Sequence, residues 1–210
     1  MGILQDISEN LIKGKANDVK VLVQKALDDG MGVGEILNDG LLAAMSVVGA
    51  RFKKNEVYVP EVLIAARAMK AGTEILKPLL AGSGVKPIGT VVLGTVKGDL
   101  HDIGKNLVGM MMEGAGFQVI DIGTDADSQK FVDKAIENEA QVIGASALLT
   151  TTMTAMKDVV EKVNASKLKG KVKVLVGGAP LTQAYCDEIG ADGYAPDAAS
   201  AADLAKSLMS

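Results

Sequence analysis

Apolar residues recur three and four positions apart along residues 3–80, and this spacing places them on one face of each of four helices. The four helical patterns cover residues 3–11, 19–27, 33–52 and 60–80. Asp28-Asp29-Gly30 ends the second helix, and Pro60 stands in the first turn of the fourth, where proline is tolerated. Pro78 falls in the last turn of that helix, and we expect Gly82 to end it. Four short amphipathic helices with short connections predict a small helical bundle.

The pattern changes after residues 81–87, whose glycines and proline predict a linker. Beyond this linker, short apolar runs alternate with helical patterns. The expected strands are 90–95, 117–122, 141–146, 172–176 and 193–195, and the expected helices are 104–116, 128–139, 152–168, 181–189 and 198–209. Five such units predict an α/β fold with a doubly wound, five-stranded, flavodoxin-like parallel sheet. We therefore expect an all-α domain over residues 1–88 and a Rossmann-like domain over residues 89–210.

The composition supports a buried core and excludes several classes of protein. Hydrophobic residues make up 48% of the chain and aromatic residues only 3%, so the core must be mainly aliphatic. The net charge of −4 argues against a nucleic-acid partner, because such binding needs a basic patch. Cys186 is the only cysteine, which excludes an internal disulfide and fits a reducing compartment. Early acidic residues argue against a signal peptide, and no stretch approaches the roughly 20 apolar residues of a membrane span. We expect a cytoplasmic protein without a membrane partner.

One loop carries the most distinctive chemistry in the sequence. His101, the only histidine, follows the first expected strand within Gly98-Asp99-Leu100-His101-Asp102-Ile103-Gly104. Imidazole binds borderline metals, and a ligating imidazole usually donates its other N–H to a carboxylate, which Asp99 could supply. Taken alone, such a histidine is more often a solvated or capping residue. One cysteine and one histidine do not make a zinc site. A metal on His101 would therefore arrive with most of its ligands already in place, as in a macrocycle.

Two further loops follow strands of the same expected sheet. Ser146 and Leu148 come after the third strand, with Thr150 and Thr152 next to them, and Gly177-Gly178 ends the fourth. Hydroxyls donate or accept hydrogen bonds, and adjacent glycines let a backbone approach a ligand closely. Alternatively, the threonines cap a helix and the glycines turn a corner. Because the carboxyl ends of parallel strands meet at one edge, all three loops are expected on one rim, where such sheets bind ligands.

Together the loops resemble a known signature. The motifs, in order, are Asp99-x-His101-x-x-Gly104, Ser146-x-Leu148 and Gly177-Gly178. They resemble the cobalamin-binding signature of methionine synthase, of the corrinoid proteins of methyltransferase systems and of coenzyme-B12 mutases. Residues 57–62 and 66–69 resemble the last helix of the cap domain in the methyl-transferring branch. The whole chain thus resembles a stand-alone corrinoid protein of the methanol, methylamine or methoxyarene type.

The resemblance implies a cobalamin or related corrinoid bound base-off and His-on. His101 would bind the cobalt through Nε2, Asp99 would hold Nδ1–H, and a hydroxyl of Thr150 or Thr152 would complete the relay. The family often has serine where Thr152 stands, which leaves that geometry open. The loop positions expected to contact the corrinoid are Gly98, Asp99, His101, Asp102, Ile103 and Gly104. The slot for the displaced nucleotide tail would be lined by Ser146, Leu148, Thr150, Gly177 and Gly178, with Tyr194 and Asp197 at its far end.

The helical domain would cover the upper face of the cobalt. Tyr58, Val62, Ala66 and Met69 share one side of the fourth helix and are the expected contacts. The alternative for each of them is a place in the core of the bundle. An apolar cap would exclude water from the reactive face, and residues 82–87 would serve as the hinge that lets it move aside.

The function implied by the resemblance is methyl transfer in one-carbon metabolism. The corrinoid subunit would carry a methyl group on cobalt from a substrate-specific donor methyltransferase to an acceptor methyltransferase that uses tetrahydrofolate or a thiol. A reductive activator is a further expected partner, and the chain alone is not a complete enzyme. Alternatives are the B12-binding subunit of a radical mutase, a B12-dependent sensor or regulator, and a receiver or flavodoxin-like module without B12. A receiver needs an aspartate after the third strand, where this chain has Ser146.

Overall fold

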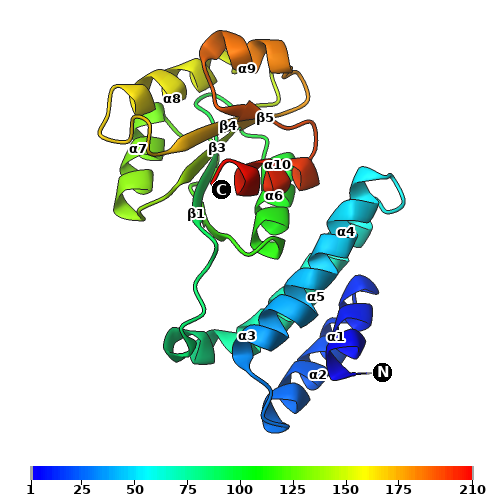
Figure 1. The fold of residues 1–210 in the computed structure, drawn as a ribbon. Helices are drawn as coiled ribbons and strands as arrows, with labels where there is room; N and C mark the ends of the chain where they lie inside the picture. Colours follow the sequence, from blue (N-terminus) through cyan, green and yellow to red (C-terminus); the bar gives the residue numbers. More distant parts are fainter. Residues whose placement is uncertain (1, 210) are drawn as a thin grey trace. The chain divides into compact units, whose positions relative to one another are not determined.

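The computed structural model describes residues 2–209, which divide into two compact units. One unit runs to Lys86 and includes residues 114–116, and the other comprises residues 87–113 and the chain from Phe117 onward. The first unit is helical and the second is α/β (Figure 1). Each unit is described by itself below.

The helical unit is a bundle in which α2 packs along α5, and α1 packs along α2 and α4. Its elements are α1 (Ile3–Ile12), α2 (Ala16–Asp28), α3 (Val33–Glu35), the π-helix η1 (Ile36–Leu42), α4 (Ala43–Lys53) and α5 (Val59–Ser83). Apolar side chains at the predicted helical spacing form the interior, and those with no exposed surface include Ile7, Leu11, Val19, Val23, Ile36, Leu41 and Leu76. The predicted bundle is confirmed, but the π-helical turn inside the third helix was not predicted.

The ends of α5 follow from local hydrogen bonding and backbone geometry. The helix begins at Val59, where the Glu61 carboxylate accepts a hydrogen bond from the Tyr58 N–H at 3.1 Å. The expected end at Gly82 was wrong, because the helix continues through Ser83 with Pro78 inside it. It ends at Gly84, whose left-handed φ of 74° glycine adopts without steric cost. The connection to the α/β unit is therefore shorter than the linker predicted from the sequence.

Among the described residues, one helical segment, Val33–Lys53, is long and apolar enough to cross a membrane by length and composition alone. The expectation that no stretch comes near this threshold was therefore wrong. Its most apolar window has a mean hydropathy of 1.3 and is 39% buried inside the structure. A core helix passes the same test, so this segment is weak evidence for a membrane span.

The α/β unit contains a five-stranded parallel sheet with the order β2-β1-β3-β4-β5. The strands are β1 (Thr90–Thr95), β2 (Gln118–Asp121), β3 (Val142–Ser146), β4 (Lys173–Gly177) and β5 (Gly193–Tyr194). The helices between and after them are α6 (Ile103–Gly114), α7 (Ser128–Glu137), α8 (Thr154–Asn164), α9 (Gln183–Ile189) and α10 (Ala198–Ser207). This is the flavodoxin-like order, so the predicted doubly wound sheet is confirmed.

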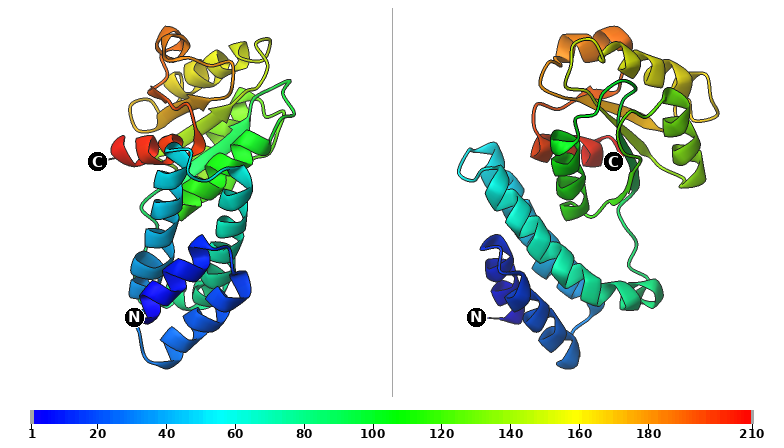
Figure 2. Two further views of the ribbon diagram at one scale, coloured as in Figure 1. Left: turned by 90° about the vertical axis from the view of Figure 1, so that its right-hand side faces the viewer. Right: turned by 180° about the vertical axis from the view of Figure 1, so that it is seen from behind.

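Helices cover both faces of this sheet (Figure 2). On one face, a cluster of buried side chains joins the strands to α7, α8 and α9, with Phe131, Ile143 and Met156 among its members. On the other face, Gly109 of α6 lies against Leu93 of β1. Because both faces are buried, the strands are continuous apolar runs, which is why they were readable from the sequence.

Candidate functional site

The three loops predicted to share an edge do so. Thr95 at the end of β1 pairs with Ser146 at the end of β3, and Ser146 pairs with Gly177 at the end of β4. We call residues 96–102 the histidine loop, residues 147–153 the β3–α8 turn and residues 122–127 the β2–α7 turn. Because β1 lies between β2 and β3, the histidine loop starts between these two turns.

Asp99 is the most enclosed polar group at this edge. Its side chain is fully buried, and hydrogen bonds reach both carboxylate oxygens. Oδ1 accepts from the His101 N–H at 3.0 Å and lies 2.7 Å from Nδ1 of the His101 ring. Oδ2 accepts from the Thr152 hydroxyl at 2.7 Å and from the N–H groups of Leu148 at 2.8 Å and Leu149 at 3.3 Å. A carboxylate surrounded by donors in this way is held in the ionised, acceptor-only form.

Two opposing effects act on the pKa of Asp99. Burial raises it, because desolvation penalises the charged form. The hydrogen bonds from the His101 N–H, the Thr152 hydroxyl, the Leu148 N–H and the His101 ring lower it and prevail. The pKa of Asp99 therefore lies well below its ordinary value.

The Asp99 carboxylate determines what His101 can bind. With Nδ1 of the ring directed at Asp99, the hydrogen belongs on Nδ1 and the lone pair on Nε2. The His101 side chain is 50% exposed, and no described residue makes a hydrogen bond to Nε2. The site therefore offers one accessible imidazole nitrogen in a fixed tautomer.

Of the two threonines considered for the relay, Thr152 is the one that contacts Asp99. Its side chain is buried, and its hydroxyl also lies 2.9 Å from the carbonyl oxygen of Leu149. Thr150 is exposed, and no described hydrogen bond joins it to Asp99. The start of α8 beside Thr152 is held from α9, where the Tyr185 hydroxyl donates to the Met153 carbonyl at 2.7 Å.

Residues that the sequence reasoning missed hold the main chain of the histidine loop. The hydroxyl of Thr95 donates to the His101 carbonyl at 2.9 Å, although Thr95 belongs to β1 and is fully buried. Asp125 accepts from the Gly98 N–H at 2.8 Å and donates its own N–H to the Asp99 carbonyl at 3.0 Å. A polar residue ending an apolar strand was a readable signal for Thr95. Nothing in the sequence around Asp125 indicated this contact.

An ion pair joins the first turn of α6 to the end of β2. Lys105, immediately after Gly104, is buried and forms an ion pair with Asp121 at the end of β2. The Lys105 side chain is 2% exposed and that of Asp121 is 47% exposed, so losing Asp121 would leave a buried ammonium without its counter-charge. The pair holds the first turn of α6 beside the end of β2. The pair was also missed by the sequence reasoning, which treated position 105 as an ordinary helical residue.

The outer surface of the histidine loop has room for a flat apolar group. Leu100 and Ile103 flank His101 and are 73% and 79% exposed, an unusual degree for large apolar side chains. A Cβ atom added to Gly104 would meet nothing within 4 Å, so the helix start presents bare backbone there. Asp102 is exposed as well, and its carboxylate accepts from the Asn106 side chain at 3.1 Å.

The two glycines after β4 have different physical roles. A Cβ on Gly177 would touch only the Ala195 carbonyl, at 3.8 Å, so this position is open to an approaching group. A Cβ on Gly178 would lie 1.8 Å from the Ala147 carbonyl, and its φ of 141° also favours glycine. Gly178 therefore lets the loops after β3 and β4 pass each other, a packing role that the sequence did not reveal.

The remaining residues proposed for the tail slot are placed along the same edge. Ser146 is half-buried and Leu148 is 43% exposed. Tyr194 in β5 is half-buried, and Asp197 follows it. The Asp197 carboxylate caps α10 by accepting from the Ser200 N–H at 2.9 Å and the Ser200 hydroxyl at 2.6 Å. This capping engages both oxygens of Asp197.

The four residues expected on the cap lie on or just before α5 in the helical unit. Tyr58 is 62% exposed and precedes the helix. Val62 is fully buried, Met69 is 8% exposed and Ala66 is half-buried. The burial of Val62 and Met69 fits the alternative of core packing, whereas the exposure of Tyr58 leaves its ring available to another molecule.

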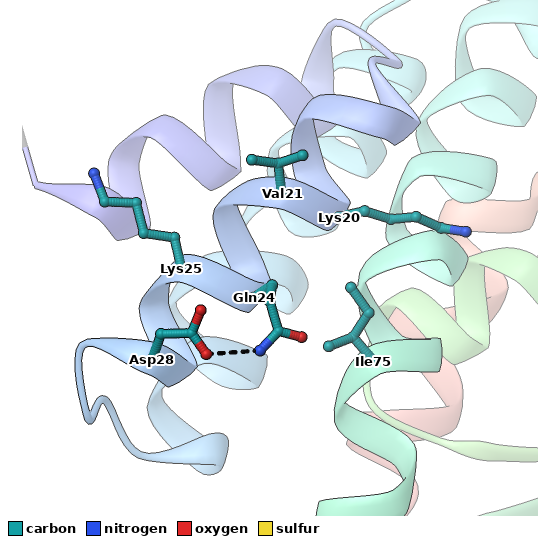
Figure 3. Close-up of a pocket in the computed structure, with 6 residues that line it drawn as sticks. All are labelled: Lys20, Val21, Gln24, Lys25, Asp28 and Ile75. Atoms are coloured by element: carbon teal, nitrogen blue, oxygen red, sulfur yellow. Dashed lines mark hydrogen bonds between the residues drawn. The ribbon is translucent and has the colours of Figure 1, made fainter.

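The donor chemistry fits a metal that brings most of its own ligands. Among the described residues, no group of three or more His, Cys, Asp or Glu side chains is placed to hold a bare ion. A separate surface pocket of about 490 Å³ lies between α2 and α5 (Figure 3). It is lined by Lys20, Val21, Gln24, Lys25, Asp28 and Ile75. This pocket contains no imidazole or thiol, so the chemistry concentrates at the histidine loop.

Comparison with known proteins gives matches over nearly the whole chain. Two family models, each described as a B12 binding domain, match residues 3–77 and residues 89–203. A corrinoid protein of Desulfitobacterium hafniense (strain Y51) is 44% identical over 212 residues, covering 100% of this chain and 98% of that protein. A dimethylamine corrinoid protein of Methanosarcina barkeri is 45% identical over 208 residues, covering 99% of this chain and 97% of that protein.

Solved structures match as well. The crystal structure of the methanol:cobalamin methyltransferase complex MtaBC from Methanosarcina barkeri contains a chain that matches with a TM-score of 0.89 and 28% identity. That match covers 99% of this chain and 79% of the other. A cobalamin-binding protein from Desulfitobacterium hafniense DCB-2 matches with a TM-score of 0.80 and 29% identity, covering 97% of each chain.

Proposed function

Because this chain belongs to the B12-binding corrinoid proteins of methyltransferase systems, we propose that it carries a methyl group between two methyltransferases. Its cofactor is a corrinoid, as the two B12-binding family models and the corrinoid relatives indicate. When bound, the corrinoid supplies the cobalt on which the methyl group is carried, and the protein supplies position and electrostatics. The donor is a substrate-specific methyltransferase, and the acceptor methyltransferase uses tetrahydrofolate or a thiol. A reductive activator is the third partner in this proposal.

A single observation carries the proposed binding mode. The Nδ1 atom of His101 lies 2.7 Å from the buried Asp99 carboxylate, which leaves Nε2 as the free ring nitrogen. We assign Nε2 as the lower ligand of the cobalt, in place of the cofactor's own base. A carboxylate behind a ligating imidazole raises its basicity and fixes its tautomer. Thr152 holds the other oxygen of Asp99, so the hydroxyl supports the orientation of the carboxylate.

The surrounding surface fits the rest of the cofactor. Exposed Leu100 and Ile103 supply apolar area beside the ligand, and bare backbone at Gly104 allows close approach, whereas a Cβ on Gly98 would lie 3.6 Å from the Thr152 methyl group. The residues proposed for the nucleotide tail are Ser146, Leu148, Thr150, Gly177 and Gly178, with Tyr194 and Asp197 at the far end. In the helical unit, we assign Tyr58, with Val62, Ala66 and Met69 behind it, to the cap over the upper face.

The first experiment is uptake of corrinoid by the purified full-length chain. The protein is incubated with hydroxocobalamin, passed through gel filtration and examined by absorption spectroscopy. We expect corrinoid absorption bands to be retained at close to one corrinoid per chain. A folded sample that retains none would overturn the proposed function.

The second experiment uses the fact that the chain has one histidine. The protein is prepared with ¹⁵N-labelled histidine, and the reduced, paramagnetic cobalt form is examined by electron paramagnetic resonance. If His101 is the ligand, the hyperfine splitting from the axial nitrogen changes from the ¹⁴N to the ¹⁵N pattern. His101→Ala is the matched variant and should lose that splitting. An unchanged ¹⁴N pattern in the labelled wild type would show that the cofactor's own base remains on cobalt.

The cap proposal has its own test. Tyr58→Ala removes an exposed ring without opening the core, so the variant should fold and bind corrinoid normally. We expect added cyanide to reach the upper face of the cobalt several-fold faster than in the wild type. Val21→Ala is the control, because Val21 is similarly exposed but lies on α2. Equal cyanide rates in the wild type and Tyr58→Ala would exclude Tyr58 from the cap.

A further inference from the structure

The histidine loop is held from two sides, and only one of them involves the Asp99 carboxylate. On the α8 side, the β3–α8 turn donates to Oδ2 of Asp99 through Leu148 and Thr152. On the opposite side, the β2–α7 turn contacts the main chain of the loop. The strand order β2-β1-β3 makes this possible, because β1 ends between the two turns.

Asp125 makes the central contacts on the β2 side. Its Oδ1 accepts from the Gly98 N–H at 2.8 Å, and its N–H donates to the Asp99 carbonyl at 3.0 Å. The neighbouring residues extend this pairing, because Ala126 donates to the Thr95 carbonyl at 3.0 Å and Thr95 donates to Gly123 at 2.9 Å. Asp125 thus makes one hydrogen bond to Gly98 and one to Asp99.

The backbone of Asp125 is in an uncommon conformation. Its φ is +51°, in the left-handed region that few residues other than glycine, asparagine and aspartate adopt. Gly98 also has a positive φ, of 80°, which lets its N–H face Asp125. Non-glycine residues persist in this region when their surroundings over-determine them. Here the surroundings are the two hydrogen bonds to the histidine loop.

We infer that Asp125 is a positioning residue for His101, acting through the main chain of Gly98 and Asp99. The inference rests on the proposed function, in which Nε2 of His101 binds cobalt. The carboxylate of Asp99 can orient the imidazole only if its own backbone is fixed, and the β2–α7 turn provides that fixation. Rigid support of this kind keeps a ligand within about 0.5 Å of its productive geometry.

The test separates the hydrogen bond of Asp125 from its backbone conformation. Asp125→Gly keeps the left-handed conformation but removes the acceptor of the Gly98 N–H. Asp125→Asn keeps both, because an amide oxygen accepts and asparagine tolerates a positive φ. Glu139→Gly is the control, because Glu139 also has a positive φ, of 49°, but lies in the turn before β3. Thermal melting should show all three variants folded.

The first readout needs no corrinoid. Nitrogen NMR of the single histidine reports the ratio of the Nδ1–H to the Nε2–H tautomer, which Asp99 controls. Losing one hydrogen bond to a charged acceptor should shift the ratio about fivefold toward Nε2–H in Asp125→Gly. Asp125→Asn and Glu139→Gly should stay within about twofold of the wild type. A wild-type ratio in Asp125→Gly, or an equal loss in Asp125→Asn, would overturn the inference.

The second readout uses the corrinoid-loaded protein and the axial-nitrogen splitting described above. Asp125→Gly should bind corrinoid, but the ratio of histidine-ligated to histidine-free cobalt should fall about fivefold, as the tautomer ratio does. Asp125→Asn should restore the wild-type ratio. A wild-type fraction in Asp125→Gly would overturn the positioning role even if the tautomer moved. If the wild type itself takes up no corrinoid, the proposed function fails, and the tautomer ratios still decide whether Asp125 positions His101.

Discussion

The two units use polar side chains in different ways. Many side-chain hydrogen bonds of the helical unit join residues close together on one helix, as between Gln24 and Asp28. In the α/β unit, described hydrogen bonds join Asp99 to Leu148 and Thr152, about 50 positions away along the chain. Local bonds on a helix surface add little to the tertiary fold, whereas long-range bonds to a buried carboxylate fix one side chain in space.

This difference indicates how each unit is stabilised. The helical unit relies on apolar packing among residues such as Leu11 and Leu76, so its surface should tolerate polar substitutions. The edge of the α/β unit carries a polar network that stabilises the fold and orients His101 at the same time. Substitutions in this polar network should change the tautomer of His101, whereas substitutions in the helical unit should not.

The largest expected effect is on the packing of the helical unit. Leu11→Ala removes a fully buried side chain and should cost about 2–5 kcal/mol of stability, through lost burial and a cavity. Hydrogen exchange followed by mass spectrometry should show faster exchange in α1 and α2. Leu79→Ala, at a position 46% exposed, is the control and should change exchange little. A shift of the His101 tautomer in Leu11→Ala would contradict the separation of the two roles.

The next largest effect concerns Asp99. Asp99→Asn places an amide NH₂ among the N–H groups of His101 and Leu148 and the hydroxyl of Thr152, where only an acceptor fits. We expect the free energy of unfolding to fall by about 2–4 kcal/mol, because buried donors are left unpaired. Urea unfolding measures this decrease. In contrast to Leu11→Ala, the tautomer of His101 should change in the same variant, and an unchanged tautomer would show that Asp99 does not direct the ring.

Acid should reduce the difference between the wild type and Asp99→Asn. The pKa of Asp99 is lowered in the folded protein despite its burial, because its hydrogen-bond donors outweigh desolvation. A carboxylate with a lowered folded pKa contributes stability that is fully present above its unfolded pKa of about 3.9 and is lost as the pH falls below it. The stability gap measured by urea unfolding should therefore shrink as the pH falls below about 4. A gap that widens below about pH 4 would reverse the assigned sign.

The sequence predicted the elements of both units from the pattern of buried apolar residues. Apolar runs identified all five strands, and helical spacing identified the bundle, because these patterns reflect burial of whole segments. The π-helical turn over Ile36–Leu42 and the continuation of α5 past Gly82 were not predicted, since they depend on local packing and backbone geometry. Pattern alone therefore predicted the elements better than their ends.

The candidate site was predictable where a single loop contains its parts. Asp99 and His101 stand two positions apart, so their contact could be foreseen from spacing. The choice of Thr152 over Thr150 depends on how the β3–α8 turn folds, and the sequence left both open. Asp125 lies on a separate turn, and its contacts with Gly98 and Asp99 arise only when β2 pairs with β1. Gly178 also has a packing role beside Ala147, because a Cβ there would lie 1.8 Å from the Ala147 carbonyl, and the spacing of the motifs did not reveal this role.

A smaller effect should follow from the hydroxyl of Thr152. Thr152→Val keeps the shape of the side chain but removes the single hydroxyl hydrogen shared between Oδ2 of Asp99 and the Leu149 carbonyl. We expect a loss of about 1–2 kcal/mol by urea unfolding and a partial change in the His101 tautomer ratio. Thr152→Ser keeps the hydroxyl and should restore the tautomer ratio to within the error of the measurement. If the valine and serine variants gave equal ratios, the hydroxyl would have no part in holding Asp99.

The smallest effect is expected on the surface of the helical unit. Gln24→Ala removes the hydrogen bond from the Gln24 amide to Asp28 at 2.8 Å, beside the pocket between α2 and α5 (Figure 3). Because both side chains are exposed and four residues apart on one helix, we expect a loss of at most about 0.5 kcal/mol, partly offset by the helix propensity of alanine. Urea unfolding and hydrogen exchange of α2 measure it. A loss above about 1 kcal/mol would mean that this pair supports tertiary structure, as the hydrogen bonds to Asp99 do. The proposed contrast between the two units would then be wrong for the helical unit.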